Sequence, residues 1–156
     1  MKRTEQTSKS TKKVNEMKLR LPSLSVNESV ARATVAAFCA QMDPCAMELA
    51  DIKCAVSEAV TNCIVHAYRD TMGVIYITVS LYENRRVRIE IRDRGCGIED
   101  VQIARQPLYT TDAQGERSGM GFTVMESFMD RLSVRSTVGK GTTVTMKKQL
   151  TDLARL

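Results

Sequence analysis

The sequence predicts an α/β fold, an α+β sandwich in which helices pack on one face of a mostly antiparallel, mixed sheet. Between Ser25 and Ala67 the apolar residues recur at helical spacing, and from Val74 the spacing changes to two, which is typical of strands. Helices and paired strands of this kind each have one apolar face, and they stabilise each other by burying it. We therefore expect a single two-layer domain.

Length and composition are those of one globular domain. The chain has 156 residues, of which 43% are hydrophobic and 26% are charged, and this is enough for a core of its own. We expect a folded domain over residues 15–150, between a disordered basic tail at 1–14 and a short C-terminal tail at 151–156. No apolar run is long enough for a membrane helix, and the basic start leads into no hydrophobic stretch. A cytoplasmic protein without membrane contact is expected.

The net positive charge belongs to the start of the chain. Residues 1–20 hold seven basic and two acidic side chains, and the remainder holds sixteen of each. A neutral domain without a basic stripe argues against direct binding of nucleic acid. The five cysteines form no C-x-x-C pair, so we expect reduced, mostly buried thiols and no zinc site.

The first half of the chain predicts one strand and two helices. Residues 17–21 alternate enough to form an edge strand, which ends at a proline. Ser25 and Glu28 have the spacing of a capping box at the start of the first helix. The Asp-Pro pair at 43–44 predicts a second helix, with Asp as its N-cap, that runs to about Ala67.

The second half predicts two hairpins separated by a long polar connection. The connection, over residues 98–121, contains a short helical piece near Val101, and a segment this long inside a compact domain is usually functional or mobile. A helix follows from about Met120 to Met129. The predicted strands cover residues 74–82, 87–91, 132–136 and 142–147.

One face of the second helix combines a carboxylate with an amide. Glu58 and Asn62 stand four residues apart, so both side chains leave the same side of the helix. A carboxylate can accept a proton, and an amide oxygen can ligate a hard cation such as Mg²⁺. Taken alone, the pair is more typical of a solvated polar face, and its neighbouring motifs favour the functional interpretation.

An acid and two glycines follow the strand at 87–91. Asp93 continues the inward phase of that strand, where an isolated carboxylate costs several kcal/mol unless it is hydrogen-bonded. The amino group of a ligand is one possible partner, and a purely structural turn is the other. Gly95 and Gly97 would let the backbone approach a flat ring closely. Thr142 shares the inward phase of the last strand and should face the same side.

A glycine pair precedes the third helix. Backbone amides at Gly119 and Gly121 would point outward at the positive end of that helix, which favours a phosphate group. Arg117 would add a charge-assisted contact to a terminal phosphate. A lone G-x-G is also common in ordinary turns.

In this order the motifs resemble those of the GHKL (Bergerat-fold) nucleotide-binding family, and within it the small anti-sigma serine kinases. Glu58 to Asn62 is similar to the N box of that family, and Asp93 to Gly97 is similar to its first glycine box. The segment from Arg105 to Ser118 resembles the ATP lid, and Gly119 to Gly121 and Gly139 to Thr142 resemble the later glycine boxes. A departure from the family is Ala67, where glycine is frequent.

The resemblance implies a role for each of these residues. Glu58 would be the general base, Asn62 the Mg²⁺ ligand, and Asp93 the acceptor of the adenine amino group. ATP would also be contacted by Gly95, Gly97, Arg117, Gly119, Gly121 and Thr142. Arg32, on the first helix, would contact a sigma factor.

The function implied is that of an anti-sigma factor and ATP-dependent protein serine kinase with ATP and Mg²⁺ as cofactors. Such a protein, as a homodimer, would sequester a sporulation sigma factor of the sigma-F type and phosphorylate an anti-anti-sigma protein on serine. The alternatives are a general-stress anti-sigma kinase of the same family and a nucleotide-gated sigma-binding module without kinase activity. A detached histidine-kinase catalytic domain would need a phosphorylatable histidine on another chain.

Overall fold

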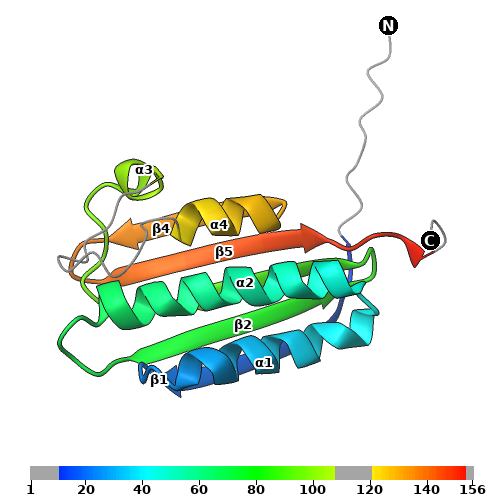
Figure 1. Cartoon of the computed structure of the whole chain (residues 1–156), viewed down its shortest axis with the longest axis horizontal. Helices are drawn as coiled ribbons and strands as arrows, with labels where there is room; N and C mark the ends of the chain where they lie inside the picture. Colours follow the sequence, from blue (N-terminus) through cyan, green and yellow to red (C-terminus); the bar gives the residue numbers. More distant parts are fainter. Residues whose placement is uncertain (1–10, 108–120, 154–156) are drawn as a thin grey trace, which may run out of the picture.

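The computed structural model describes residues 11–107 and 121–153 and confirms the predicted two-layer architecture (Figure 1). Helical turns of the 3₁₀ type at Ala40–Met42 and of the π type at Cys63–Ala67 extend the first two helices. The elements are, in chain order, β1 (Lys13–Pro22), α1 (Asn27–Cys39), α2 (Ala46–Asn62), β2 (Val74–Tyr82), β3 (Arg86–Arg92), α3 (Val101–Ala104), α4 (Gly121–Phe128), β4 (Arg131–Thr137) and β5 (Gly141–Gln149).

The strands form one sheet in the order β1-β2-β3-β5-β4. All four neighbouring pairs are antiparallel. The prediction was a mostly antiparallel, mixed sheet, whereas the described strands form a sheet without any parallel pair. β1 lies at an edge, as expected. It begins at Lys13, where it pairs with Tyr82 of β2, so residues 13 and 14 belong to the sheet and not to a disordered tail.

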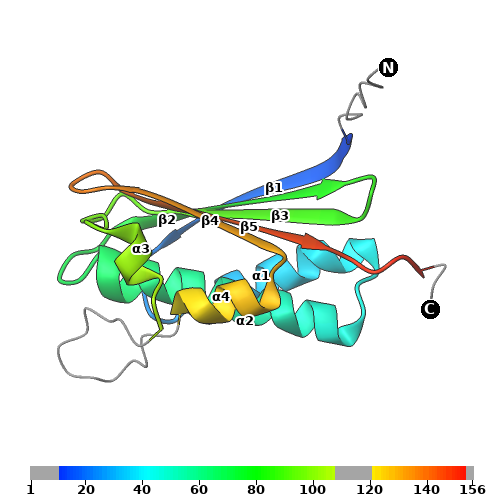
Figure 2. The same cartoon turned by 90° about the horizontal axis from the view of Figure 1, so that it is seen from above.

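The three longer helices cover one face of the sheet (Figure 2). The inward side chains of β2 and β3, which are Ile75, Ile77, Val79, Leu81, Val87, Ile89 and Ile91, are all at most 1% exposed and pack against the helices. Alternate burial along these strands confirms the predicted period of two. The described helices include none with the length and apolar character needed to cross a membrane.

The helix starts differ from those predicted. The N-cap of α1 is Val26, which makes no side-chain capping hydrogen bond. Ser25 contributes its backbone carbonyl, which accepts a hydrogen bond from the amide of Glu28. The carboxylate of Glu28 instead accepts from the side chains of Arg32 and Ser57. The N-cap of α2 is Cys45, which makes a capping box with Glu48. Asp43 lies outside that helix, at φ 49°.

The opposite face of the sheet is open and basic. Its outward side chains include Lys18, Arg20, Arg88, Arg92, Arg131, Arg135 and Lys147, with Glu16 and Glu90 as the acids in the same rows. The expectation that the domain lacks a basic stripe is therefore wrong. Sequence-wide neutrality concealed it, because the compensating acids lie elsewhere on the fold.

The cysteines are also distributed differently from the prediction. All five are free, but Cys45, Cys54 and Cys96 are exposed, and only Cys39 and Cys63 are buried. The expectation of mostly buried thiols is wrong for this reason. No group of three or more His, Cys, Asp or Glu side chains arranged to hold a metal occurs among the residues described.

Candidate functional site

The buried carboxylate of Asp93 lies at the end of β3, between the two layers. It is 6% exposed, and its Oδ1 accepts the amides of Gly95 at 2.9 Å and Thr142 at 3.2 Å. Its Oδ2 has a weaker neighbour, the thiol of Cys63, with Sγ at 3.7 Å. Burial raises the pKa of Asp93, and the two backbone hydrogen bonds oppose that effect. One carboxylate oxygen thus has the structural, turn-forming role, while the other lacks a strong donor from the described protein.

Thr142 lies beside Asp93 at the start of β5. It is 8% exposed, and its Oγ1 is 2.8 Å from the hydroxyl of Ser136. The close approach depends on Gly141, whose φ is +121° and where a Cβ would lie 2.2 Å from the carbonyl oxygen of Asp93. Inward-facing hydroxyls of β4 and β5 therefore accompany the carboxylate. Ser136 was not predicted, because its role depends on the pairing of β4 with β5.

Glu58 and Asn62 converge on the first residue of α4. A Cβ added to Gly121 would lie 3.3 Å from both Oε2 of Glu58 and Oδ1 of Asn62. The predicted helix pair and one of the predicted glycines are thus neighbours in space, although about sixty residues separate them in the chain. Arg117 and Gly119 lie outside the described residues, as does most of the lid segment. Arg105, the first residue of that segment, makes an ion pair with Glu126 of α4.

The loop of Gly95 and Gly97 packs against protein backbone. A Cβ at Gly95 would lie 2.3 Å from the carbonyl oxygen of Ala67, at the end of the π turn. The amide of Cys96 donates to that same carbonyl at 3.1 Å. Gly97 has φ +76°, and a Cβ there would lie 2.4 Å from the carbonyl oxygen of Thr137. Both glycines are therefore required by the fold itself, whether or not they approach a ligand ring.

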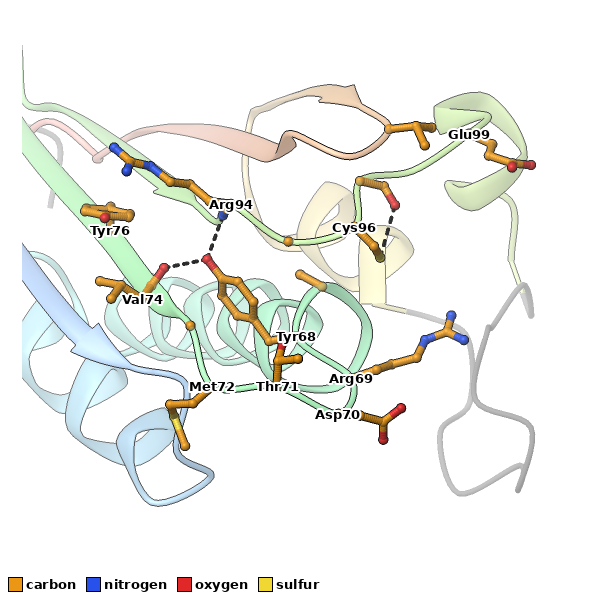
Figure 3. Close-up of a pocket in the computed structure, with 15 residues that line it drawn as sticks. Tyr68, Arg69, Asp70, Thr71, Met72, Val74, Tyr76, Arg94, Cys96 and Glu99 are labelled. Carbon is orange, nitrogen blue, oxygen red and sulfur yellow. Dashed lines mark hydrogen bonds between the residues drawn. The ribbon is translucent and has the colours of Figure 1, made fainter.

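An open cleft lies beside this loop (Figure 3). It has a volume of about 890 Å³, and its lining includes Gly95 and Gly97 but not Glu58, Asn62, Asp93 or Thr142. Tyr68 forms its inner wall, with a hydroxyl that donates to the carbonyl of Val74 at 2.8 Å and accepts the amide of Arg94 at 2.6 Å (Figure 3). The buried face of the glycine loop thus meets Asp93, and its outer face meets this cleft.

A second cavity of about 320 Å³ lies between α1 and α2. It is lined by Glu58 together with Ser25, Glu28, Ser57, Thr61, Ile64 and Val65. Glu58 is therefore near the start of α4 and also open to a groove between two helices. Arg32 adjoins this groove through Glu28, with Nη1 at 3.2 Å from Oε1. Its side chain is half-exposed, and it is ion-paired with Glu28.

Comparisons with known proteins agree with this geometry. Residues 21–148 match the family model described as "Histidine kinase-like ATPase domain". The anti-sigma F factor of Caldanaerobacter subterraneus is 57% identical over 87% of this chain and 94% of its own length. The anti-sigma F factor of Priestia megaterium is 55% identical over 88% of this chain and 95% of its own length.

Solved structures show the same fold at lower identity. The RsbU and RsbW domains of a Mycobacterium tuberculosis protein match with a TM-score of 0.65 and 22% identity, over 88% of this chain and 33% of that one. A histidine kinase domain of Erythrobacter litoralis matches with a TM-score of 0.53 and 20% identity, over 79% of this chain and 61% of that one. Together with the high identity to the anti-sigma F factors, the family match shows that this chain belongs to the histidine kinase-like (GHKL) ATPases, in the group of the anti-sigma F factors.

Proposed function

We propose that this chain is an anti-sigma factor that binds Mg-ATP and phosphorylates an anti-anti-sigma protein on serine. The observation that carries the proposal is the meeting of Glu58 and Asn62 at Gly121, with Glu58 also lining the groove between α1 and α2. The names of the relatives support a sigma-F type sigma factor as the second partner. A homodimer and a cytoplasmic location belong to the same proposal.

The residues present fit a bound magnesium nucleotide. The amide oxygen of Asn62 is a hard ligand suited to Mg²⁺, and the glycine at 121 leaves the start of α4 free of a side chain there. Oδ2 of Asp93, whose donor among the described residues is the weak thiol of Cys63, would accept a hydrogen bond from the amino group of adenine. When bound, Mg-ATP supplies the phosphoryl group and the neutralising charge. The proposed ATP site is completed by Gly95, Gly97, Thr142, Arg117 and Gly119.

Glu58 would act on the protein substrate. A partner serine entering the groove between α1 and α2 would meet a carboxylate able to accept its proton. Ser57 and Thr61, one turn apart along the same lining, would leave the groove polar enough for a hydroxyl. Arg32 adjoins the groove and would contribute to the contact with the sigma factor.

The test is phosphotransfer from labelled ATP to candidate anti-anti-sigma proteins. Glu58→Gln should lower the transfer rate by about 10²-fold or more, because it removes the base. Its affinity for Mg-ATP, measured by calorimetry, should change less than about threefold, because the charge removed is not a proposed nucleotide ligand. Glu83→Gln, an exposed glutamate in the β2–β3 turn, is the matched control and should transfer at the normal rate.

Two outcomes would contradict the proposal. Undiminished transfer by Glu58→Gln would refute the assignment of the base. Nucleotide binding by the normal protein, without transfer to any candidate, would favour the module that sequesters its sigma factor without catalysis. A general-stress anti-sigma kinase would be recognised by transfer to the general-stress partner instead.

A further inference from the structure

A row in which arginines alternate with a tyrosine and a threonine crosses the open face of the sheet. The pairing register places Arg20 opposite Tyr76, Tyr76 opposite Arg92, Arg92 opposite Thr143 and Thr143 opposite Arg135. Each of these side chains alternates with an inward core residue, and none of the described helices covers this side of the sheet (Figure 2). With strands about 4.8 Å apart, the row is about 19 Å long.

Three arginines gather around one aromatic ring in this row. The Cζ atoms of Arg20, Arg92 and Arg94 lie 5.3, 4.8 and 5.0 Å from the centroid of Tyr76. Such contacts are attractive, and they hold the guanidinium groups close together against their mutual repulsion. The ring is thereby engaged and is not a free platform for stacking.

The row has no acidic counterpart of its own. Within the described ranges, no ion pair is formed by the arginines of this surface, which are Arg20, Arg92, Arg94 and Arg135. The acids on this face are already paired, Glu90 with Arg88 at 2.8 Å and Glu16 with Lys13 and Lys18. A surface this rich in unpaired guanidinium groups is electrostatically complementary to a partner with several negative charges.

We propose that the open face of the sheet docks an acidic segment of a partner protein, with the row from Arg20 to Arg135 as its centre. Planar guanidinium groups bind carboxylates in a bidentate manner, and the row length suits about six residues of extended chain. A protein segment is favoured over single-stranded nucleic acid, because base stacking requires a free aromatic face and Tyr76 is covered by arginines.

This surface is separate from the helical groove proposed to receive the protein substrate. Glu58 and Arg32 lie in the helical layer, whereas the arginine row lies on the opposite side of the sheet (Figure 2). A partner on the sheet and a partner on the helices would therefore bind without competing for the same residues. The inference does not depend on phosphotransfer.

The experiment measures binding of a fluorescein-labelled peptide of alternating glutamate and serine to the full chain by fluorescence anisotropy. The double variant Arg92→Glu/Arg135→Glu should bind at least about tenfold more weakly, because two attractive pairs become repulsive. The control Lys53→Glu/Arg69→Glu makes the same charge change at exposed positions outside the sheet and leaves the basic tail intact. It should change the affinity by less than about twofold, and binding of the normal chain should weaken as salt rises.

A milder pair, Arg92→Gln/Arg135→Gln, repeats the test if the charge reversal impairs folding, and Glu58→Gln should bind the peptide normally. Equal binding by the row variants and the normal chain would overturn the proposal. So would tighter binding of a DNA or RNA oligonucleotide than of the peptide, lost in the row variants, because the face would then be a nucleic-acid surface. A change in the sedimentation of the unliganded row variants would overturn it as well, by showing that this face joins two copies of the chain.

Discussion

At the scale of single residues, the least ordinary feature is the buried carboxylate of Asp93. Two backbone amides satisfy one oxygen, and the other faces the thiol of Cys63. Burial also raises the pKa of Cys63 well above its usual range. The carboxylate is thus held in an environment that disfavours its charge, and this is an arrangement that functional sites retain at a cost in stability.

Replacing Asp93 by asparagine should stabilise the unliganded protein and weaken nucleotide binding. Because burial raises the pKa of Asp93, the carboxyl contributes stability at low pH that is lost as the pH rises through its native pKa. Asparagine has no such proton to lose. The Tm of Asp93→Asn minus that of the normal chain should therefore increase between about pH 4 and pH 7.

The same variant should bind ATP about 10- to 100-fold more weakly, because a charge-assisted hydrogen bond becomes a neutral one at best. Calorimetric titration measures this loss, and thermal denaturation across the pH range measures the stability difference. Asp43→Asn, at an exposed position between α1 and α2, is the control for both. A Tm difference that does not vary with pH would contradict the account given for Asp93.

What the sequence predicts at this scale is the direction in which side chains point. The phase of β3 correctly predicts that Asp93 is buried, and the helical spacing correctly places Glu58 and Asn62 on one face. Contacts with Cys63 and Ser136 were not predicted, because they join elements that are distant in the sequence. The roles of Arg117 and Gly119 stay predictions.

At the scale of elements, the end of α2 packs closely against the loop of Gly95 and Gly97. The π turn at Cys63–Ala67 ends the helix, and its last carbonyl, on Ala67, accepts the amide of Cys96. A π turn inserted in a helix often lies at a functional site. Here it places the helix end in backbone contact with the loop that leads from Asp93.

Gly95→Ala and Gly139→Ala should have unequal effects on stability. The new Cβ at position 95 would lie 2.3 Å from the carbonyl oxygen of Ala67, so backbone must move, and we expect a loss above about 3 kcal/mol. At position 139 a Cβ meets nothing within 4 Å, and only the positive φ of +77° is unfavourable, which costs about 1–2 kcal/mol. Urea denaturation gives both free energies of unfolding. Equal losses would show that the packing of the loop on α2 is not tight.

The residue at which a helix starts is harder to predict than the helical periodicity, and α2 shows why. The Asp-Pro pair at 43–44 has the composition of a helix start, yet Asp43 is left-handed and the cap is Cys45. The deciding residue is Glu48, which caps α2 and also accepts two hydrogen bonds from Thr151, beyond β5. Local composition contains no information on that partner.

At the scale of the whole molecule, the fold separates groups that the sequence mixes. Basic residues collect on the open face of the sheet, and the apolar residues of all five strands collect on the other. The fold class, the strand periods and the covered face were predictable from hydrophobic spacing. The basic face was not, because it requires the order and register of the strands.

Selective reactivity of the five cysteines should report global unfolding. Cys45, Cys54 and Cys96 are exposed and should react with N-ethylmaleimide under native conditions. Burial raises the pKa of Cys39 to about 12 and that of Cys63 strongly as well, so both should react only as the protein unfolds. Pulsed labelling with peptide mass spectrometry measures each site. Native labelling of Cys63 at the rate of Cys54 would show that the region around Asp93 opens locally.

The course of the chain also bears on how this domain can be joined to others. β1 starts and β5 finishes at the same end of the sheet, and the glycine loops and the start of α4 are at the opposite end (Figure 1). Lys13 and Leu153, near the two ends of the described chain, therefore lie away from the glycine loops. The fold is therefore suited to serve as a portable module, and it does occur as one part of a longer Mycobacterium tuberculosis chain. Fusion partners or tags at either end should leave the end with the glycine loops accessible.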